Sequence, residues 1–327
     1  MLVVSSYHYI RPNFDTPYAG IFGMTPSQFE NQLGRLSKIA NFVSAADILW
    51  AIEKDSILSE NILLLTFDDG LKEQCEYALP ILDKMGIPAV FYINTFNFSE
   101  HKISTVHKIH LLLANLPIEE CQKFIYECAD QLFGKTIELV DNAFVLKQYR
   151  YDSKERGTLK YFLNYCLNFE EQVTIIDLLF RRTFTEPESR ICKNMYLSED
   201  DIIKLANREY LGSHSHRHIP LGLYSEAIID NDIKVSMEII KEKTGHTPAS
   251  ISYPYGSIEV AGELVQKKAK DNGFKFGFTF ERGCNLDLSQ PFKLSRFDCN
   301  ELPGGKSALF KDQDFFAGIS FSLGGIK

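Results

Sequence analysis

The stretch Ile62-Leu63-Leu64-Leu65-Thr66-Phe67-Asp68-Asp69-Gly70 places two adjacent carboxylates at the end of an apolar run. A short apolar run that is bounded by turn residues is typical of a buried strand. Charge at the rim of a core is costly, so the two carboxylates need a cation, a hydrogen-bond network or open solvent. An ordinary Asp-Gly turn with both side chains in water is the alternative, because both residue types are common in turns.

Composition limits the kinds of protein that this chain can be. It has 327 residues, 45% hydrophobic and 24% charged, as in a globular protein with a substantial core. The net charge is −8 and no long Lys/Arg cluster occurs, so nucleic acid is not an expected partner. The seven cysteines lack C-x-x-C spacing, which indicates free thiols. No signal peptide or membrane span is recognisable, so we predict a cytoplasmic protein.

Strands and helices alternate in both halves of the sequence. Predicted strands lie at 2–9, near 41–43, and at 62–67, 88–93, 210–214, 250–253, 274–280 and 292–297. Predicted helices lie at 25–36, 44–54, 72–85, 198–207, 225–243 and about 258–271. This alternation indicates parallel βα units. Seven or eight such strands favour an α/β barrel, with an open doubly wound sheet as the alternative.

Residues 96–195 interrupt the alternation with a block that is helical in pattern and has no strong strand. We interpret residues 1–327 as one barrel domain with a helical insertion at about 96–195. Insertions on a rigid scaffold often carry specificity, so a cover over the substrate is one expected role. Packing alone is the other.

A second stretch, His214-Ser215-His216-Arg217-His218, holds three of the chain's eight histidines. His214 and His218 are four residues apart, which brings their imidazoles to one side of a helical turn or tight loop. Catalytic zinc typically has three protein ligands and an open position, and imidazole is its commonest ligand. Two histidines and one carboxylate complete such a set. A solvated His-rich turn that caps the next helix is the alternative.

In a parallel barrel the C-terminal ends of all strands meet on one face. Asp68-Asp69 and His214 each fall at the end of a predicted strand. His8, Tyr253-Pro254-Tyr255-Gly256 and Arg296 lie at the ends of three others. We therefore expect these groups to line one rim.

Three motifs resemble those of a known family. Thr66-Phe67-Asp68-Asp69-Gly70 and the His-Ser-x-x-His pattern of 214–218 resemble the first two signature motifs of the NodB-homology polysaccharide deacetylases, carbohydrate esterase family 4. Ser252-Tyr253-Pro254-Tyr255-Gly256 resembles part of their third motif. The resemblance covers about 1–95 and 196–300 and excludes the helical block.

The resemblance implies a distorted (β/α)7–8 barrel that removes N-acetyl groups from an amino sugar or polysaccharide. It also implies a divalent metal, usually zinc, with cobalt and nickel as alternatives. By position, Asp69, His214 and His218 correspond to metal ligands and Asp68 to the general base. The metal polarises the acetyl carbonyl and lowers the pKa of bound water toward ~7, while Asp68 takes the proton.

The third motif corresponds to the substrate groove. Tyr253, Pro254 and Tyr255 are expected to contribute to the groove wall, where an aromatic ring suits the apolar face of a sugar. A backbone amide near Tyr255 is expected to stabilise the oxyanion together with the metal.

Two positions depart from the family pattern. The third motif commonly begins with an arginine that orients the base, and Ser252 stands there instead. We predict that Arg296 supplies the missing guanidinium. No histidine follows His246 to act as the late general acid, so His8 is the candidate for that role. A core-edge histidine bonded to backbone is the alternative reading of His8.

Two other functions compete with N-deacetylation. One is hydrolysis of another small amide or ester at the same metal, and the other is a non-catalytic glycan-binding module that retains the metal site. Asp68 argues against the binding module, because metal binding requires only Asp69 and the two histidines.

Overall fold

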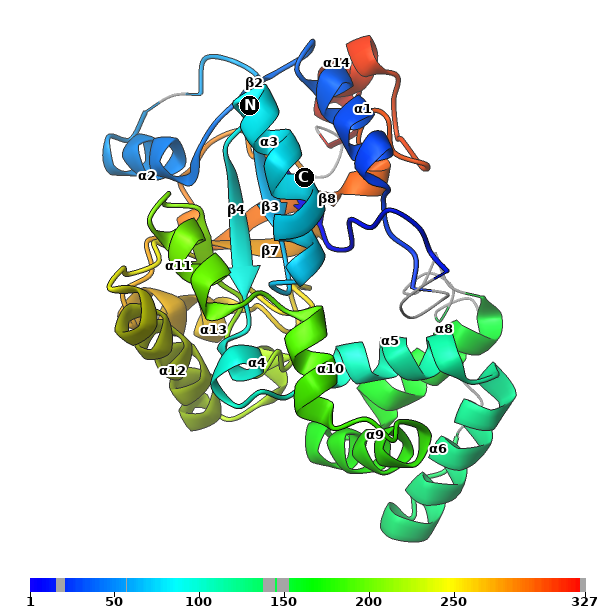
Figure 1. Ribbon diagram of the computed structural model, residues 1–327. Helices are drawn as coiled ribbons and strands as arrows, with labels where there is room; N and C mark the ends of the chain where they lie inside the picture. The colour runs from blue at the N-terminus through cyan, green and yellow to red at the C-terminus, as the bar shows by residue number, and fades with distance from the viewer. Residues whose placement is uncertain (16–20, 57, 138–144, 146–152, 324–327) are drawn as a thin grey trace. The chain divides into compact units, whose positions relative to one another are not determined.

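Parallel strands form a closed barrel in a computed structural model of the protein, which describes residues 1–15, 21–56, 58–137, 145 and 153–323 (Figure 1). The ring consists of β1 (Leu2–Tyr7), β3 (Ile62–Phe67), β4 (Ala89–Ile93), β5 (Leu211–Ser213), β6 (Ser250–Ser252), β7 (Phe276–Arg282) and β8 (Leu294–Asp298). It closes because β1 pairs with both β3 and β8. An extra strand, β2 (Asn41–Phe42), pairs with the start of β3. The predicted barrel is therefore confirmed, and the open doubly wound sheet is excluded.

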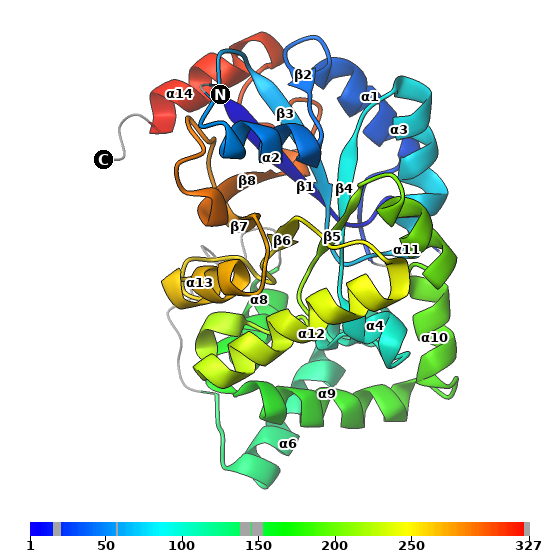
Figure 2. The same cartoon turned by 90° about the vertical axis from the view of Figure 1, so that its left-hand side faces the viewer.

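Helices surround the barrel, and all but the last of them, α14, follow the order that the sequence predicts (Figure 2). They are α1 (Pro26–Leu36), α2 (Ala45–Glu53), α3 (Leu79–Met85), α11 (Glu199–Ala206), α12 (Glu226–Thr244), α13 (Glu263–Asp271) and α14 (Phe315–Leu323). Thr25, Ser44 and Ser198 cap α1, α2 and α11 with capping boxes, so their side chains satisfy backbone donors that the helix leaves open. Helix α13 begins later than predicted because Gly262 takes its N-cap position.

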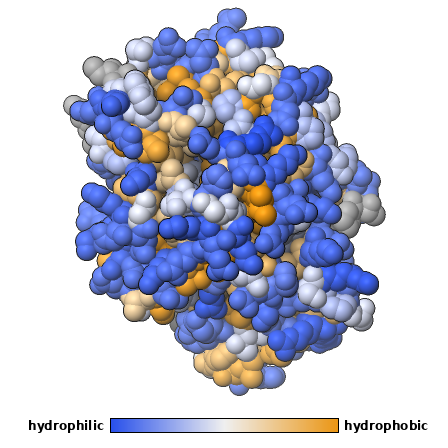
Figure 3. All heavy atoms as spheres, turned by 60° about the vertical axis from the view of Figure 1, so that its left-hand side comes forward, coloured by the Kyte–Doolittle hydropathy of each residue, from blue (hydrophilic) through white to orange (hydrophobic). Residues whose placement is uncertain are grey.

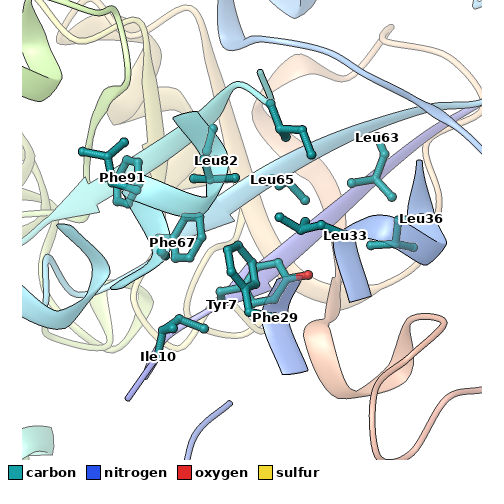
Figure 4. Packing of buried hydrophobic residues seen from close by; sticks show 14 of the residues in the cluster. Tyr7, Ile10, Phe29, Leu33, Leu36, Leu63, Leu65, Phe67, Leu82 and Phe91 are labelled. Atoms are coloured by element: carbon teal, nitrogen blue, oxygen red, sulfur yellow. The ribbon is translucent and has the colours of Figure 1, made fainter. Parts of the chain in front are cut away.

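The side chains of β3 alternate between two buried clusters. Leu63, Leu65 and Phe67 pack outward against the surrounding helices (Figure 4). Leu64 packs inward with residues of β1, β4, β7 and β8, which only the barrel interior can bring together. Successive residues of a strand point to opposite faces, so Asp68 continues the inward series after Leu64 and Thr66. The strand itself therefore directs one of the two carboxylates toward the barrel axis.

The described residues divide into two compact units. The barrel unit comprises Met1–Asn13, Gly23–Lys102 and Cys192–Lys327, and it includes the short helix α4 (Thr95–Ser99). The second unit comprises Ile103–Ile191 and Phe14–Phe22. Its helices are α5 (Thr105–Asn115), α6 (Ile118–Phe133), α8 (Lys154–Tyr161) and α9 (Phe169–Thr183), and α10 (Glu188–Met195) begins in it. The substrate-covering role of this block stays a prediction.

An ion-pair network holds part of the second unit together. The ammonium of Lys108 is buried and lies 2.6 Å from a carboxylate oxygen of Asp177 and 2.8 Å from one of Glu188. Both carboxylates are needed there, because a buried ammonium without partners would be costly. Among the described helices of the chain, none is long and apolar enough to cross a membrane.

Candidate active site

Three buried side chains converge where β3 and β5 end. The Nε2 atoms of His214 and His218 lie 3.5 and 3.4 Å from Oδ1 of Asp69. The three potential ligand atoms, a carboxylate oxygen of Asp69 and one ring nitrogen each of His214 and His218, all lie within 4.8 Å of one another. Ligand atoms around a tetrahedral zinc, with bonds of ~2.0–2.2 Å, are separated by roughly 3.4 Å. One carboxylate and two imidazoles at this spacing fit a divalent metal.

A tight loop, not a helical turn, brings the two imidazoles together. Ser215 and His218 both have left-handed backbone conformations, with φ of 64° and 53°. The Nδ1–H of His214 donates to the carbonyl of Ser252 at 2.7 Å, which leaves Nε2 directed toward Asp69. Burial lowers the pKa of His214 to about 4, so this imidazole is neutral at neutral pH. The neutral ring is the form that binds metal.

Neighbouring polar groups hold this loop in place. The carboxylate of Asp232, on α12, accepts the backbone N–H groups of His216 and Arg217 at 2.9 and 3.2 Å. His216 turns away from the cluster, and its Nδ1 lies 2.8 Å from the hydroxyl of Thr95. The amide of Asn94 donates to the carbonyl of His214. The sequence analysis did not identify Asp232 or Asn94 as site residues.

Arg296 clamps Asp68 inside the barrel. Its Nη1 lies 2.9 Å from Oδ1 of Asp68 and its Nη2 lies 2.8 Å from Oδ2. The guanidinium is itself fixed, because Nε donates to the carbonyl of Thr279 at 3.0 Å and Nη1 donates to Oγ1 of Thr66 at 3.2 Å. Ser252 adds a bond from its hydroxyl to Oδ2 of Asp68 at 3.2 Å. The side chain predicted to replace the missing arginine thus reaches the predicted base.

The charge state of Asp68 follows from this clamp. Burial alone would raise the pKa of the carboxyl, but Arg296, together with His214 and His8, outweighs it and lowers the pKa to about 2. Asp68 is therefore ionised at neutral pH, in a fixed orientation. A carboxylate oxygen has two lone pairs, so Oδ1 keeps acceptor capacity beside its bond to Arg296, whereas Oδ2 already accepts from both Arg296 and Ser252.

His8 lies on the same side of the site. It is half-buried and follows the end of β1, with its ring edge-on to Phe280 at 6.5 Å between centroids. The amide of Gln74 donates to the carbonyls of His8 and Asp68, at 3.0 and 2.7 Å, and so ties the ends of β1 and β3 together. The structure thus brings His8 close enough to Asp68 for its charge to affect that carboxyl.

The residues of the third motif take different positions. Tyr255 is half-buried and its ring lies 5.1 Å from that of His218, while Pro254 is buried. Tyr253, which was expected in the groove wall, is only 1% exposed, and its hydroxyl donates to the carbonyl of Phe292 at 3.2 Å. Ser252 points to Asp68, so the next residue points to the opposite side of the strand. Tyr253 therefore offers no surface to a substrate.

Phe280 is an aromatic residue of the rim that the sequence analysis missed. It is 37% exposed, and the guanidinium carbon of Arg296 lies 5.6 Å from its ring centroid. Its place in the apolar pattern of β7 resembles that of a core residue, so the sequence carries no signal for it.

Backbone strain is concentrated at the site. Among the described residues other than glycine, seven have positive φ, and four of these, Asp69, Ser215, His218 and Tyr255, belong to the cluster or its loops. Such conformations cost on the order of 1–3 kcal/mol each and persist only where the surroundings enforce them. The fold therefore stabilises this arrangement of side chains in advance of any ligand.

Comparisons with known proteins agree with this geometry. The model of the family described as Polysaccharide deacetylase matches residues 56–122 and 190–277, which include all three motifs. No curated protein sequence matches the chain.

Several solved structures have a similar fold. The deacetylase PplD of Streptococcus pyogenes is 15% identical, with 91% of each chain covered and a TM-score of 0.50. IcaB of Ammonifex degensii is 15% identical, with 90% of each chain covered and a TM-score of 0.53. A de-N-acetylase of Aggregatibacter actinomycetemcomitans is 14% identical, with 94% of this chain and 97% of that chain covered and a TM-score of 0.53. Over the two segments that the family model matches, the three motifs and the barrel strands agree with it, so this part of the chain is of the polysaccharide deacetylase type.

Proposed function

We propose that the protein is a metal-dependent hydrolase that removes N-acetyl groups from an amino sugar in a glycan. The observation that carries this proposal is the pairing of a three-ligand cluster with a clamped carboxylate beside it. Asp69, His214 and His218 would hold the metal, for which we propose zinc, with cobalt or nickel as alternatives. When bound, the metal supplies positive charge that polarises the acetyl carbonyl and makes water more acidic.

The protein residues supply the proton transfers. Water adds to the acetyl carbonyl carbon while Asp68 accepts one of its protons, and Arg296 and Ser252 keep that carboxylate oriented. The backbone N–H of Tyr255 donates to the carbonyl oxygen as negative charge develops there. The C–N bond then breaks, and the leaving nitrogen takes a proton from His8. The products are acetate and a free amine on the sugar.

Two other functions compete with N-deacetylation, and the test below distinguishes them from it. A glycan-binding module would need the metal ligands but no oriented base, so the double contact between Arg296 and Asp68 favours an enzyme. Another small amide or ester would use the same cluster and the same base. The cytoplasmic location inferred from the sequence stays a prediction.

The direct test is acetate release from a panel of acetylated amino sugars, oligosaccharides and nucleotide sugars, with zinc, cobalt or nickel added. Asp69→Ala and His214→Ala should lose both bound metal, measured by elemental analysis, and activity. Asp68→Asn should keep the metal and lose activity. His216→Gln is the matched control, because His216 is in the same loop but contacts Thr95 instead of the cluster. A folded wild type that binds no metal would refute the proposal, and a metal-loaded protein that is silent on the whole panel would support the binding module.

A further inference from the structure

A cavity of about 350 Å³ opens on the barrel unit at the end opposite the metal cluster. Leu211 and Ser250, which line it, begin β5 and β6, whereas His214 and Ser252 lie at the other ends of these strands. The remaining walls come from α2, the residues that follow α11, and the C-terminal end of α12. These helices lie on the side of the molecule that Figure 3 brings forward. The volume is that of a typical small-ligand site.

The chain's only tryptophan lies in the wall of this cavity. Trp50, on α2, is 59% exposed although it is the largest apolar side chain type. Burying an indole in the core is the more stable arrangement for folding, so an indole exposed beside a cavity suggests a ligand. The face of an indole attracts cations and packs well against the C–H face of a sugar ring.

The polar groups of the cavity are acidic. Glu53 and Glu209 both line it and are exposed, and neither forms an ion pair with a lysine or arginine within the described part of the chain. His246 and Thr247 line the same cavity and add hydrogen-bonding groups. Two carboxylates beside an indole face are complementary to a positively charged amine on a polar ring.

We propose that this cavity binds an amino-sugar unit that carries a free amine. The choice of glycan rests on the proposed function, because deacetylation converts a neutral acetamido sugar into a cationic one. A polymer held here by units that have already been deacetylated would keep its remaining acetylated units at high local concentration near the metal cluster. The cavity would therefore bind the product, not the substrate, of the reaction.

Trp50 makes the cavity directly observable, since all tryptophan fluorescence of the chain comes from this side chain. A glucosamine oligosaccharide with free amines should change the fluorescence in a saturable way. The fully N-acetylated oligosaccharide and a glucose oligosaccharide of equal length should bind at least tenfold more weakly. The double variant Glu53→Gln/Glu209→Gln should also bind the amine-bearing oligosaccharide at least tenfold more weakly, and added salt should weaken binding by wild type.

Two controls separate this site from the metal cluster. Asp69→Ala should keep the fluorescence response in full, because the cavity does not use the metal. If wild type responds to the amine-bearing oligosaccharide but releases no acetate from any acetylated sugar, the proposed function is refuted and the cavity assignment still holds. Equal responses to amine-bearing and acetylated sugars, or unchanged affinity in the double glutamine variant, would refute the cavity assignment. The cavity assignment would also be refuted if sedimentation gave the mass of a dimer and the emission maximum of Trp50 shifted with protein concentration. A second copy of the chain would then cover Trp50.

Discussion

Arg296 in the middle of β8 makes two contacts, of 2.9 and 2.8 Å, with the carboxylate of Asp68 beyond the end of β3. Both side chains are almost completely buried, with 1% and 3% of their surfaces exposed. The pair thus joins two strands that are not neighbours in the barrel. It contributes to the stability of the fold as well as to the orientation of the proposed base.

Arg296→Gln should therefore lower both stability and turnover. Breaking a buried pair leaves an uncompensated charge, which costs about 3–5 kcal/mol of unfolding free energy. Loss of orientation should reduce acetate release roughly 100-fold, with metal content unchanged. Urea unfolding and acetate assays test both effects. Arg35→Gln is the control, because Arg35 pairs with Asp312 and both side chains are partly exposed, at 44% and 28%. Equal turnover in wild type and Arg296→Gln would contradict the orienting role.

Ser252→Ala should have a much smaller effect. It removes one hydrogen bond to Asp68, worth about 1 kcal/mol, and leaves both contacts with Arg296. His214 contacts the carbonyl of Ser252 and not its hydroxyl, so metal affinity should not change. A loss of turnover as large as that of Arg296→Gln would show that the serine hydroxyl has a role beyond orienting Asp68.

Asp232→Asn should weaken metal binding without touching a ligand. An amide oxygen can accept at the loop, but the amide NH₂ would face a backbone N–H that needs an acceptor. Groups that orient metal ligands typically contribute 10–100-fold in affinity, so we expect a loss of about that size in a competition assay with a chelator. Asp230→Asn on the same helix is the control, because Asp230 contacts Asn272 and Lys268 instead. Unchanged metal affinity in Asp232→Asn would rule out the positioning role.

His8→Gln should alter the pH dependence of turnover. If His8 protonates the leaving amine, turnover falls at high pH as the imidazole loses its proton, and the variant loses this alkaline limb. Turnover at the optimum should fall about 100-fold or more. Steady-state rates across the pH range, with metal content measured in parallel, test this. A variant that keeps the alkaline limb would exclude His8 as the acid and support its alternative role at the edge of the core.

Glu209→Gly should stabilise the protein. Glu209 has φ of 59°, a left-handed conformation that costs a residue with a side chain roughly 1 kcal/mol relative to glycine. Gly86→Ala is the matched opposite, because Gly86 has φ of 66° and an added methyl group would meet no other atom within 4 Å. Thermal unfolding should show one variant above wild type and the other below it. A loss of stability in Glu209→Gly would show that the carboxylate itself holds the turn.

The barrel and the meeting of Asp68-Asp69 with the histidine stretch could be predicted because each depends on local pattern, whereas the assignment of Asp69 as ligand and Asp68 as base came from the family resemblance. An apolar run followed by carboxylates marks a strand end, and parallel topology brings strand ends together whatever their separation in sequence. The same reasoning led to Arg296, although β8 continues to Asp298 and Arg296 lies in the middle of the strand instead of at its predicted end.

Other parts of the site depend on packing that a linear pattern does not contain. In the sequence, Asp232 resembles an ordinary surface residue of an amphipathic helix. It accepts two backbone N–H groups only because α12 packs against the histidine loop. The orientation of Tyr253 was predicted wrongly because the sequence pattern did not show which side chains of β6 face into the barrel. Once Ser252 faces inward, Tyr253 must face outward.

Because the barrel closes through β1 and β8, its first and last strands, it cannot close until nearly the whole chain has been synthesised. Asp68 and Arg296 are separated by 228 residues, so at typical rates of synthesis the arginine is made roughly 10–45 s after the aspartate. During this interval Asp68 has no arginine to pair with, and β1 has no β8 to pair with. The nascent chain must therefore keep its first strands soluble until the last barrel strand arrives, which makes this stage of synthesis the one most exposed to aggregation and to chaperone binding.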